Sequence, residues 1–228
     1  MDFIFMLTRH DQTVADAHQV LDMALTTGVR RIGFKDVGAT LEELGLLTEA
    51  IREAGAVSYM EVVSTTSEAV RRSLGTAADI GVDYILGGQD LELAREAFPG
   101  GLERFFPFPG KPHGHPTALG GRPRDVARDC EAYVDAGCGG VDLLAFRATE
   151  AEPLELVRAA RASLAGRELI VAGSVDSPER IRALAEAGVD AFTIGSAIFD
   201  GSFSPNKGSF LSQLLDVLEV CANAPCAA

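Results

Sequence analysis

Short apolar runs alternate with longer amphipathic stretches along most of the chain. The runs are rich in β-branched and aromatic residues, which is typical of buried strands, and the stretches between them have the period of helices. Eight runs predict strands, at residues 2–8, 31–36, 57–63, 82–87, 104–108, 140–145, 168–173 and 190–195. The clearest helical stretches are residues 13–27, 41–54, 66–78, 123–135, 153–164 and 177–187. Strands that alternate with helices in this way favour parallel βαβ units.

A glycine recurs just before many of the apolar runs, where the preceding helix is expected to end. The examples are Gly28, Gly55, Gly81, Gly137 and Gly188. A helix often ends at a residue with positive φ, a conformation that glycine adopts without strain. The first three of these glycines are 27 and 26 residues apart, so one strand–helix unit takes about 27 residues. The next interval, 56 residues, holds two such units, and the whole chain of 228 residues has room for eight. The repeat predicts an α/β protein, one (β/α)8 (TIM) barrel domain over residues 1–228, with a doubly wound open sheet as the alternative.

Composition and charge fit a globular protein and exclude some classes of partner. Hydrophobic residues make up 47% of the chain and charged residues 23%, as in ordinary globular domains. Lys and Arg total 20 against 33 Asp and Glu, which gives a net charge of -13. Nucleic acids and anionic membranes attract cationic surfaces, so we expect neither as a partner. An anionic small molecule would need a locally positive pocket.

The sequence favours a cytoplasmic location. No apolar run approaches the ~18 residues of a membrane helix, and the apolar opening, residues 1–7, is too short for a signal peptide and lacks a basic start. The cysteines Cys130, Cys138, Cys221 and Cys226 form no CxxC pair, so we expect free thiols. The oligomeric state is not indicated by the sequence.

Two glycine–serine pairs follow the last two predicted strands. Gly173–Ser174 comes after one and Gly195–Ser196 after the other. Glycine lets backbone N–H groups approach a phosphate without obstruction by a Cβ atom, and a short helix that begins near Ser196 would point its positive end at the same oxygens. TIM barrels frequently bind phosphate at this place. The pairs predict a phosphate site; the alternative is two tight turns that need glycine for backbone reasons.

Residues 168–201 resemble the closing units of the ribulose-phosphate-binding barrels, a superfamily that includes histidine-biosynthesis isomerases and tryptophan-pathway barrels. In those enzymes the loops after strands 7 and 8 hold a substrate phosphate. The resemblance therefore implies that Gly173, Ser174, Gly195 and Ser196 bind a phosphate group of the substrate.

The rest of the chain resembles a bacterial group whose members are often labelled 4-hydroxythreonine-4-phosphate dehydrogenase. The similarity rests on residues 33–38 (GFKDVG), 60–64 (MEVVS) and 114–117 (GHPT), and it implies one shared activity. A dinucleotide site is usually marked by G-x-G-x-x-G between a strand and a helix, which this chain lacks. The chain also departs from the histidine-pathway isomerases, which use paired aspartates at strands 1 and 5, because the corresponding ends are residues 8–11 (TRHD) and 107–109 (PFP).

A lysine and a glutamate on adjacent strands are the first candidates for chemistry. Strand alternation points Lys35 into the barrel and predicts that Glu61 also points inward. Each would tune the protonation of the other. This predicts acid/base catalysis, or imine formation by Lys35, at the carbonyl of a phosphorylated substrate. Asp36, next to Lys35, and Asp142, within the sixth strand, are further catalytic candidates; the alternative is a buried ion pair that fills the core.

The Pro- and Gly-rich residues 108–121 predict a lid or substrate clamp, because long irregular loops are often functional. Lys111 and His113 are candidate substrate-binding residues in it, and His115 is a candidate catalytic residue. Arg147, after the sixth strand, is expected to bind a carboxylate or a second anion.

No cofactor is predicted, although a divalent metal stays open as an alternative. Glu61, Asp90, His113, His115 and Asp142 have the side chains to bind one, but each would come from a different strand, so spacing cannot test the set. The favoured function is an isomerase, an aldolase or another carbon–carbon lyase that acts on a small phosphorylated substrate. The alternatives are a dehydrogenase of a phosphorylated hydroxy amino acid and a non-catalytic phosphometabolite-binding protein.

Overall fold

Eight parallel strands form the centre of the protein in the computed structural model, which describes residues 1–64 and 66–224. They are β1 (Asp2–Met6), β4 (Arg31–Lys35), β5 (Val57–Val62), β6 (Tyr84–Gly87), β7 (Phe105–Phe106), β10 (Gly140–Leu143), β11 (Glu168–Val171) and β12 (Ala191–Ile194). Their order in the sheet is β10-β11-β12-β1-β4-β5-β6-β7. Two hydrogen bonds join the ends of this sheet: the Gly139 amide donates to the Phe105 carbonyl at 3.2 Å, and the Asp142 amide to the Pro107 carbonyl at 3.1 Å. The predicted TIM barrel is confirmed.

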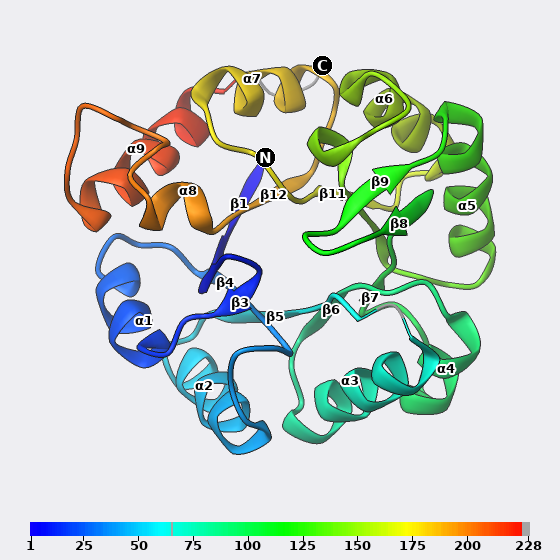
Figure 1. Ribbon diagram of the computed structural model, residues 1–228, viewed down its shortest axis with the longest axis horizontal. Coiled ribbons are helices and arrows are strands. Elements are labelled where there is room, and N and C mark those ends of the chain that lie inside the picture. The colour runs from blue at the N-terminus through cyan, green and yellow to red at the C-terminus, as the bar shows by residue number, and fades with distance from the viewer. Residues whose placement is uncertain (65, 225–228) are drawn as a thin grey trace.

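Helices surround the strands on all sides (Figure 1). They are α1 (Ala17–Leu25), α2 (Leu41–Glu53), α3 (Ser67–Ile80), α4 (Leu91–Ala97), α5 (Pro123–Asp135), α6 (Pro153–Ser163), α7 (Pro178–Glu186), the short α8 (Ser196–Phe199) and α9 (Phe210–Asn223). The Ser177 side chain accepts a hydrogen bond from the Arg180 amide and caps α7, and proline occupies the first turn, as predicted. The first predicted helix was too long, because Gln12 and Thr13 belong to a short strand and α1 begins at Ala17.

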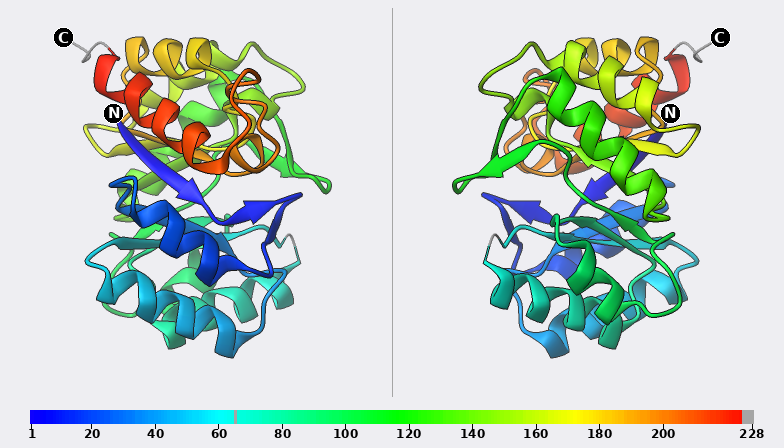
Figure 2. Two further views of the ribbon diagram at one scale, coloured as in Figure 1. Left: turned by 90° about the vertical axis from the view of Figure 1, so that its left-hand side faces the viewer. Right: turned by 90° about the vertical axis from the view of Figure 1, so that its right-hand side faces the viewer.

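Two small antiparallel hairpins project from one end of the barrel (Figure 2). The first pairs β2 (Thr8–Arg9) with β3 (Gln12–Thr13) directly after β1. The second pairs β8 (Lys111–His113) with β9 (Ala118–Gly120) after β7. Both follow the carboxyl ends of barrel strands, so they stand around the mouth where TIM barrels place their active sites. The region predicted to be an irregular lid is therefore built around a hairpin.

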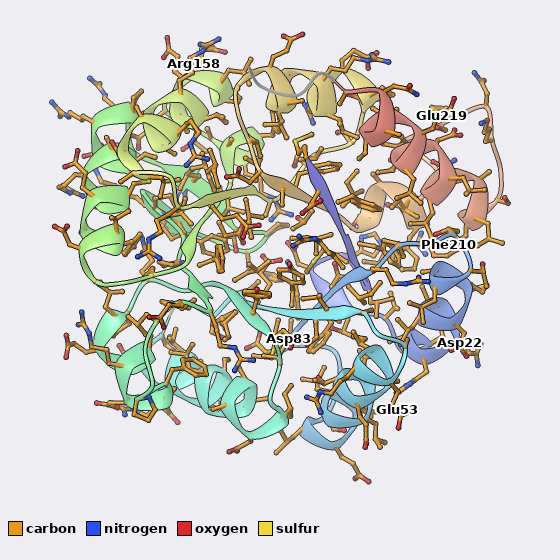
Figure 3. The ribbon with its side chains drawn as sticks, turned by 180° about the vertical axis from the view of Figure 1, so that it is seen from behind. Asp22, Glu53, Asp83, Arg158, Phe210 and Glu219 are labelled. Atoms are coloured by element: carbon orange, nitrogen blue, oxygen red, sulfur yellow. The ribbon has the colours of Figure 1, made fainter. Side chains whose placement is uncertain are left out.

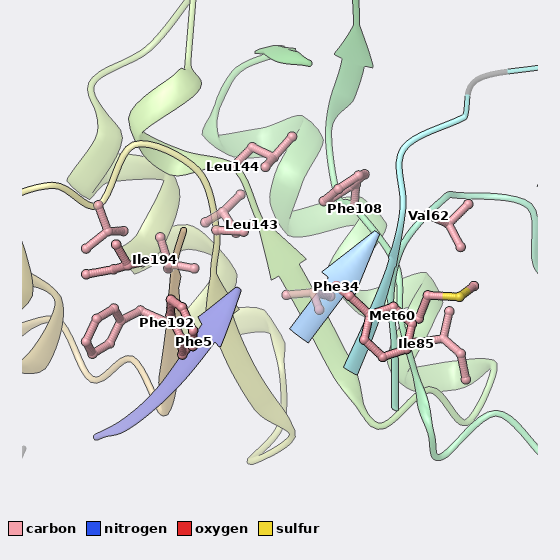
Figure 4. Packing of buried hydrophobic residues seen from close by; sticks show 14 of the residues in the cluster. Phe5, Phe34, Met60, Val62, Ile85, Phe108, Leu143, Leu144, Phe192 and Ile194 are labelled. Carbon is pink, nitrogen blue, oxygen red and sulfur yellow. The ribbon is translucent and has the colours of Figure 1, made fainter. Parts of the chain in front are cut away.

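Apolar side chains fill two layers, because successive residues of each strand point to opposite faces. The outer layer packs between strands and helices and includes Phe5, Phe34, Met60 and Phe192 (Figure 4). The inner layer fills the barrel with Ile4, Met6, Tyr59, Leu86, Phe106, Ile170 and Ala191. Charged side chains such as Glu53, Arg158 and Glu219 lie at the periphery (Figure 3). None of the helices in the described ranges has the length and hydropathy to cross a membrane.

A polar group lies at the amino end of the barrel. Arg31 donates to the Tyr59 hydroxyl at 2.5 Å and pairs with Asp2. Burial raises the pKa of Tyr59 to about 12, against the effect of Arg31. In TIM barrels, residues at this end typically serve stability, and active sites lie at the opposite, carboxyl end of the strands.

The cysteines Cys130, Cys138 and Cys221 are free thiols. Burial raises the pKa of Cys130 to about 12 and that of Cys138 and Cys221 to about 11. Thiols that stay protonated are poor nucleophiles. We therefore expect these three cysteines to pack in the core and not to react as nucleophiles. Cys226 lies outside the described residues.

Candidate active site

Lys35 and Glu61 meet at the carboxyl end of the barrel. They are partners in the parallel register of β4 and β5, and alternation points both side chains inward, as predicted. Lys35 Nζ lies 3.4 Å from Glu61 Oε1. It lies closer, 2.7 Å, to Asp11 Oδ1. All three residues are buried, so one ammonium group stands between two carboxylates in the mouth.

The turn between β2 and β3 brings Asp11 into this cluster. His10 and Asp11 both have positive φ, 52° and 58°, which reverses the chain after Arg9 and directs Asp11 back over the strands. The Thr13 hydroxyl donates to the Lys35 carbonyl at 2.8 Å and accepts from the Lys35 amide at 2.9 Å. These bonds fasten the turn to β4 beside the lysine that it contacts.

The charges of the cluster are fixed by its partners. Burial alone would lower the pKa of Lys35, but Glu61 and Asp11 outweigh it and raise that pKa above its usual value. Burial would raise the pKa of Asp11, yet Lys35 and Arg147 lower it to about 2. At neutral pH, Lys35 is therefore a cation and Asp11 an anion.

Asp142, on β10, is enclosed completely and points into the barrel. Neither of its carboxyl oxygens has a hydrogen-bond partner within the described chain. Burial, and then the nearby charge of Glu61, raise the pKa of Asp142 well above its usual value. We therefore expect Asp142 to be a neutral carboxylic acid at pH 7, since an isolated buried carboxylate is strongly disfavoured.

Arg147 ends the 3₁₀ turn η1 (Ala145–Arg147) and spans the mouth. It contacts Asp11 through both terminal nitrogens, at 3.2 and 3.4 Å, and donates to the Thr117 carbonyl at 3.1 Å. The arginine was expected to bind a carboxylate, and in this structure that carboxylate is the chain's own Asp11. The contact with Thr117 also ties the β8–β9 hairpin to the cluster.

The predicted phosphate loops lie next to this cluster. Gly173 has φ +74°, and a Cβ there would lie 2.5 Å from Arg147 Nε. A Cβ on Gly195 would lie 2.6 Å from the Thr8 carbonyl oxygen. Both positions therefore require glycine. The short helix α8 begins at Ser196, as predicted, and N–H groups of a first helical turn have no acceptor within the helix.

One cavity of about 250 Å³ joins the two parts of the site. Its polar lining includes Thr8, Asp11, Lys35, Glu61, Arg147, Gly173, Ser174, Asp176, Thr193, Gly195, Ser196 and Asp200. Four predicted phosphate-loop residues and two predicted catalytic residues thus face the same space. This arrangement can hold an anion at the loops while its other end lies against the ammonium and carboxylate groups.

Other predicted site residues lie elsewhere. Asp36 faces away from the barrel interior and accepts a hydrogen bond from Ser73 on α3. Lys111, His113 and His115 are exposed on the β8–β9 hairpin and do not line the cavity. The structure does not bring these four residues to Lys35 and Glu61.

The candidate metal ligands are also separated. Asp90 caps α4 by accepting hydrogen bonds from two amides of its first turn, both at 3.1 Å. His113 Nδ1 lies 3.0 Å from the Lys111 carbonyl. Within residues 1–64 and 66–224, no three His, Cys, Asp or Glu side chains are arranged to hold a metal ion. The proposed five-residue set does not converge.

Solved structures of other proteins are similar to this barrel over nearly the whole chain, among them several proteins from Pyrococcus species. Thiamine phosphate pyrophosphorylase from Pyrococcus furiosus has a TM-score of 0.61 at 14% identity, covering 96% of this chain and 94% of that one. A chain of the tryptophan synthase complex from the same organism has a TM-score of 0.62 at 18% identity, with 97% of each chain covered. Orotidine 5'-phosphate decarboxylase from Pyrococcus horikoshii has a TM-score of 0.63 at 14% identity, covering 95% and 99%.

The similarity to these three proteins supports the TIM-barrel fold. Their sequence identity to this chain is 18% or lower, so the roles of their residues cannot be transferred to it. A scan against protein-family models finds no match, and a search of curated proteins finds none.

Proposed function

We propose that this TIM barrel is an enzyme that transfers a proton at the carbonyl group of a small phosphorylated substrate. The supporting observation is the single cavity that faces both the Lys35–Glu61 pair and the two glycine–serine loops. A cavity of about 250 Å³ suits a ligand of a few carbon atoms with a phosphate group. Two of the similar barrels carry a phosphorylated compound in their names, thiamine phosphate and orotidine 5'-phosphate, which agrees with the proposal.

Each residue has a definite task in this reaction. The backbone around Gly173 and Gly195 binds the phosphate and fixes the substrate. Glu61, as the base, takes the proton from the carbon next to the carbonyl, and the electron pair of that C–H bond forms the double bond of an enol. The Lys35 ammonium donates a proton to the carbonyl oxygen. Asp11 keeps Lys35 protonated and in place.

The same two groups then determine the outcome. In an isomerase, Glu61 returns its proton to the former carbonyl carbon of the enediol, while the hydroxyl group on the other carbon gives its proton to Lys35 and becomes the new carbonyl. In an aldolase or another lyase, Glu61 instead takes the proton of a hydroxyl group on the carbon two positions from the carbonyl carbon. The bond between that carbon and the one next to the carbonyl then breaks, a carbonyl product leaves, and the electron pair forms the enol as Lys35 protonates the carbonyl oxygen. The raised pKa of Lys35 favours these acid/base routes over an imine, because imine formation needs the neutral amine.

The test is solvent exchange on a panel of phosphorylated ketones and aldehydes, among them dihydroxyacetone phosphate and ribulose 5-phosphate. Incubation in D2O with the protein should introduce deuterium beside the carbonyl of one member, measured by NMR. Lys35→Arg keeps the cation but alters the geometry and the acidity of the donor, and we expect exchange to fall by about 10³-fold. Lys207→Arg is the matched control, since Lys207 is exposed and paired with Asp216.

Two results would count against the proposal. If no panel member exchanges above the rate without protein, the enzyme assignment loses its support for these substrates. If Lys35→Arg exchanges as fast as Lys207→Arg, Lys35 has no part in the chemistry. Borohydride treatment during turnover separates the routes, because only an imine leaves a reduced adduct on Lys35 for mass spectrometry.

A further inference from the structure

The cations that line the cavity already have partners within the protein. Lys35 and Arg147 are the basic residues in the lining formed by the described part of the chain. Lys35 contacts Asp11 and Glu61, and Arg147 contacts Asp11 and the Thr117 carbonyl. Side-chain exposure is 5% for Lys35 and 23% for Arg147. Neither offers an unpaired positive charge to a ligand.

The acidic lining on the phosphate side is balanced in the same way. Asp176 pairs with Arg180 at 2.8 Å, and Asp200 pairs with Arg9 at 2.6 Å. Arg9 and Arg180 do not themselves line the cavity. The charges of this half of the site therefore also cancel.

We call the end of the cavity formed by Lys35, Glu61, Asp11 and Arg147 its deep end. This end has a formal charge near zero before a ligand enters. Two cations, Lys35 and Arg147, stand against two carboxylates, Asp11 and Glu61, and Arg147 reaches from this group to the Gly173 loop. A further carboxylate in this end would be placed against Asp11 and Glu61 with no cation left to pair with it. Like charges at close range in a partly buried site are costly.

Resting on the proposed function, we infer that the end of the substrate remote from its phosphate is uncharged: the substrate is a phosphorylated ketone, aldehyde or polyol and not a phosphorylated carboxylic acid. An uncharged end suits the groups present. The Lys35 ammonium has three N–H bonds; one donates to Asp11, and Glu61 lies 3.4 Å away as an ion-pair partner, so another N–H can donate to a carbonyl or hydroxyl oxygen. Glu61 can accept from a hydroxyl group.

Two small ligands test the charge of that end alone. Glycerol 3-phosphate and 3-phosphoglycerate have the same carbon chain and phosphate, but the first ends in an alcohol and the second in a carboxylate. Calorimetric titration at fixed pH and ionic strength should give at least about tenfold tighter binding of glycerol 3-phosphate. Inorganic phosphate is titrated alongside as the reference for the phosphate loops.

Variants locate the effect in the deep end. Asp11→Asn removes one anion and frees positive charge, so the preference for glycerol 3-phosphate should fall by about tenfold. Asp200→Asn is the matched control: it removes a carboxylate of the same cavity on the phosphate side, and the ratio of the two affinities should stay the same. If Asp11→Asn does not fold, Glu61→Gln makes the same test. The ratio of the two affinities in the wild type also tests the inference without any variant.

The outcomes separate this inference from the function on which it rests. If none of glycerol 3-phosphate, 3-phosphoglycerate and inorganic phosphate binds, the phosphate site fails and with it the proposed function. If 3-phosphoglycerate binds as tightly as glycerol 3-phosphate or more tightly, the phosphate site stands and the uncharged-end inference is overturned. A preference that Asp11→Asn and Asp200→Asn change equally also overturns the charge argument.

Discussion

Asp142 gives the sharpest test of the electrostatics of the mouth. Its carboxyl group is completely buried, and none of the described residues gives it a hydrogen bond; its pKa is raised well above the usual 3.8, first by burial and then by Glu61. Asp142→Asn replaces the neutral acid with a neutral group of the same shape. The asparagine side chain cannot titrate. The variant therefore lacks the contribution of residue 142 to the pH dependence of stability, while the packing around this side chain changes little.

The size of the effect follows from proton linkage. In the unfolded chain Asp142 ionises near its usual pKa, whereas in the folded protein it keeps its proton to higher pH. Between these two pKa values the folded state binds one more proton, so the free energy of unfolding falls as pH rises. One proton corresponds to about 1.4 kcal/mol per pH unit, hence about 2.7 kcal/mol between pH 5 and pH 7 if Asp142 stays protonated over that range.

Urea unfolding of the wild type and of Asp142→Asn, followed by circular dichroism at several pH values, measures this difference. The stability of Asp142→Asn relative to the wild type should increase with pH at the slope given above, and the slope should vanish at the pH where folded Asp142 ionises. Asp22→Asn, on the exposed surface of α1 (Figure 3), is the control for the loss of a carboxylate from the protein surface. A constant difference between wild type and Asp142→Asn from pH 5 to pH 7 would refute a protonated Asp142.

Three further predictions concern the loops and the two ends of the barrel. Inorganic phosphate should raise the melting temperature of the protein and of a Ser67→Glu control, but not that of Ser174→Glu, because the added carboxylate takes the place of the anion; equal stabilisation of all three would remove the phosphate site. Gly173→Ala should lower the free energy of unfolding by about 1–3 kcal/mol, measured by urea titration, because φ is positive and the new Cβ overlaps Arg147. Arg31→Met should cost about 1–3 kcal/mol in the same assay without changing phosphate binding, since it removes the donor of a buried phenol far from the mouth.

The barrel was predictable because its signals are local. The spacing of Gly28, Gly55 and Gly81 reports helix ends, and each of these glycines does have positive φ. Apolar runs report strands, and the strict alternation of a strand fixes which side chains enter the barrel. The placement of Lys35 and Glu61 follows from that alternation alone, and for the same reason Asp36, one position later, points away.

Asp11 was missed because no local pattern places it. Its position depends on a reversal of the chain after β1, made by two residues with positive φ that are not glycine. The place of His113 and His115 could not be predicted for a related reason: they lie on a hairpin with strands of three residues each, which leaves them exposed and outside the cavity lining. The alternation of residues along a strand predicts which side chains point into the barrel. It does not predict the conformation of a turn that follows the strand.

The pocket also departs from the expectation that an anionic ligand in a protein of net charge -13 needs local positive charge. Lys35 and Arg147 are present, but Asp11 and Glu61 cancel them, so on the proposed function a phosphate would be held mainly by backbone N–H groups of the loops at Gly173 and Gly195. Such donors carry only partial charges, point in fixed directions and lose no side-chain freedom on binding. A dianion can then be bound without releasing Lys35 from its carboxylates, which leaves the ammonium group protonated and aimed at the other end of the substrate. Separate binding and chemical groups in one small cavity are therefore compatible with a strongly acidic protein.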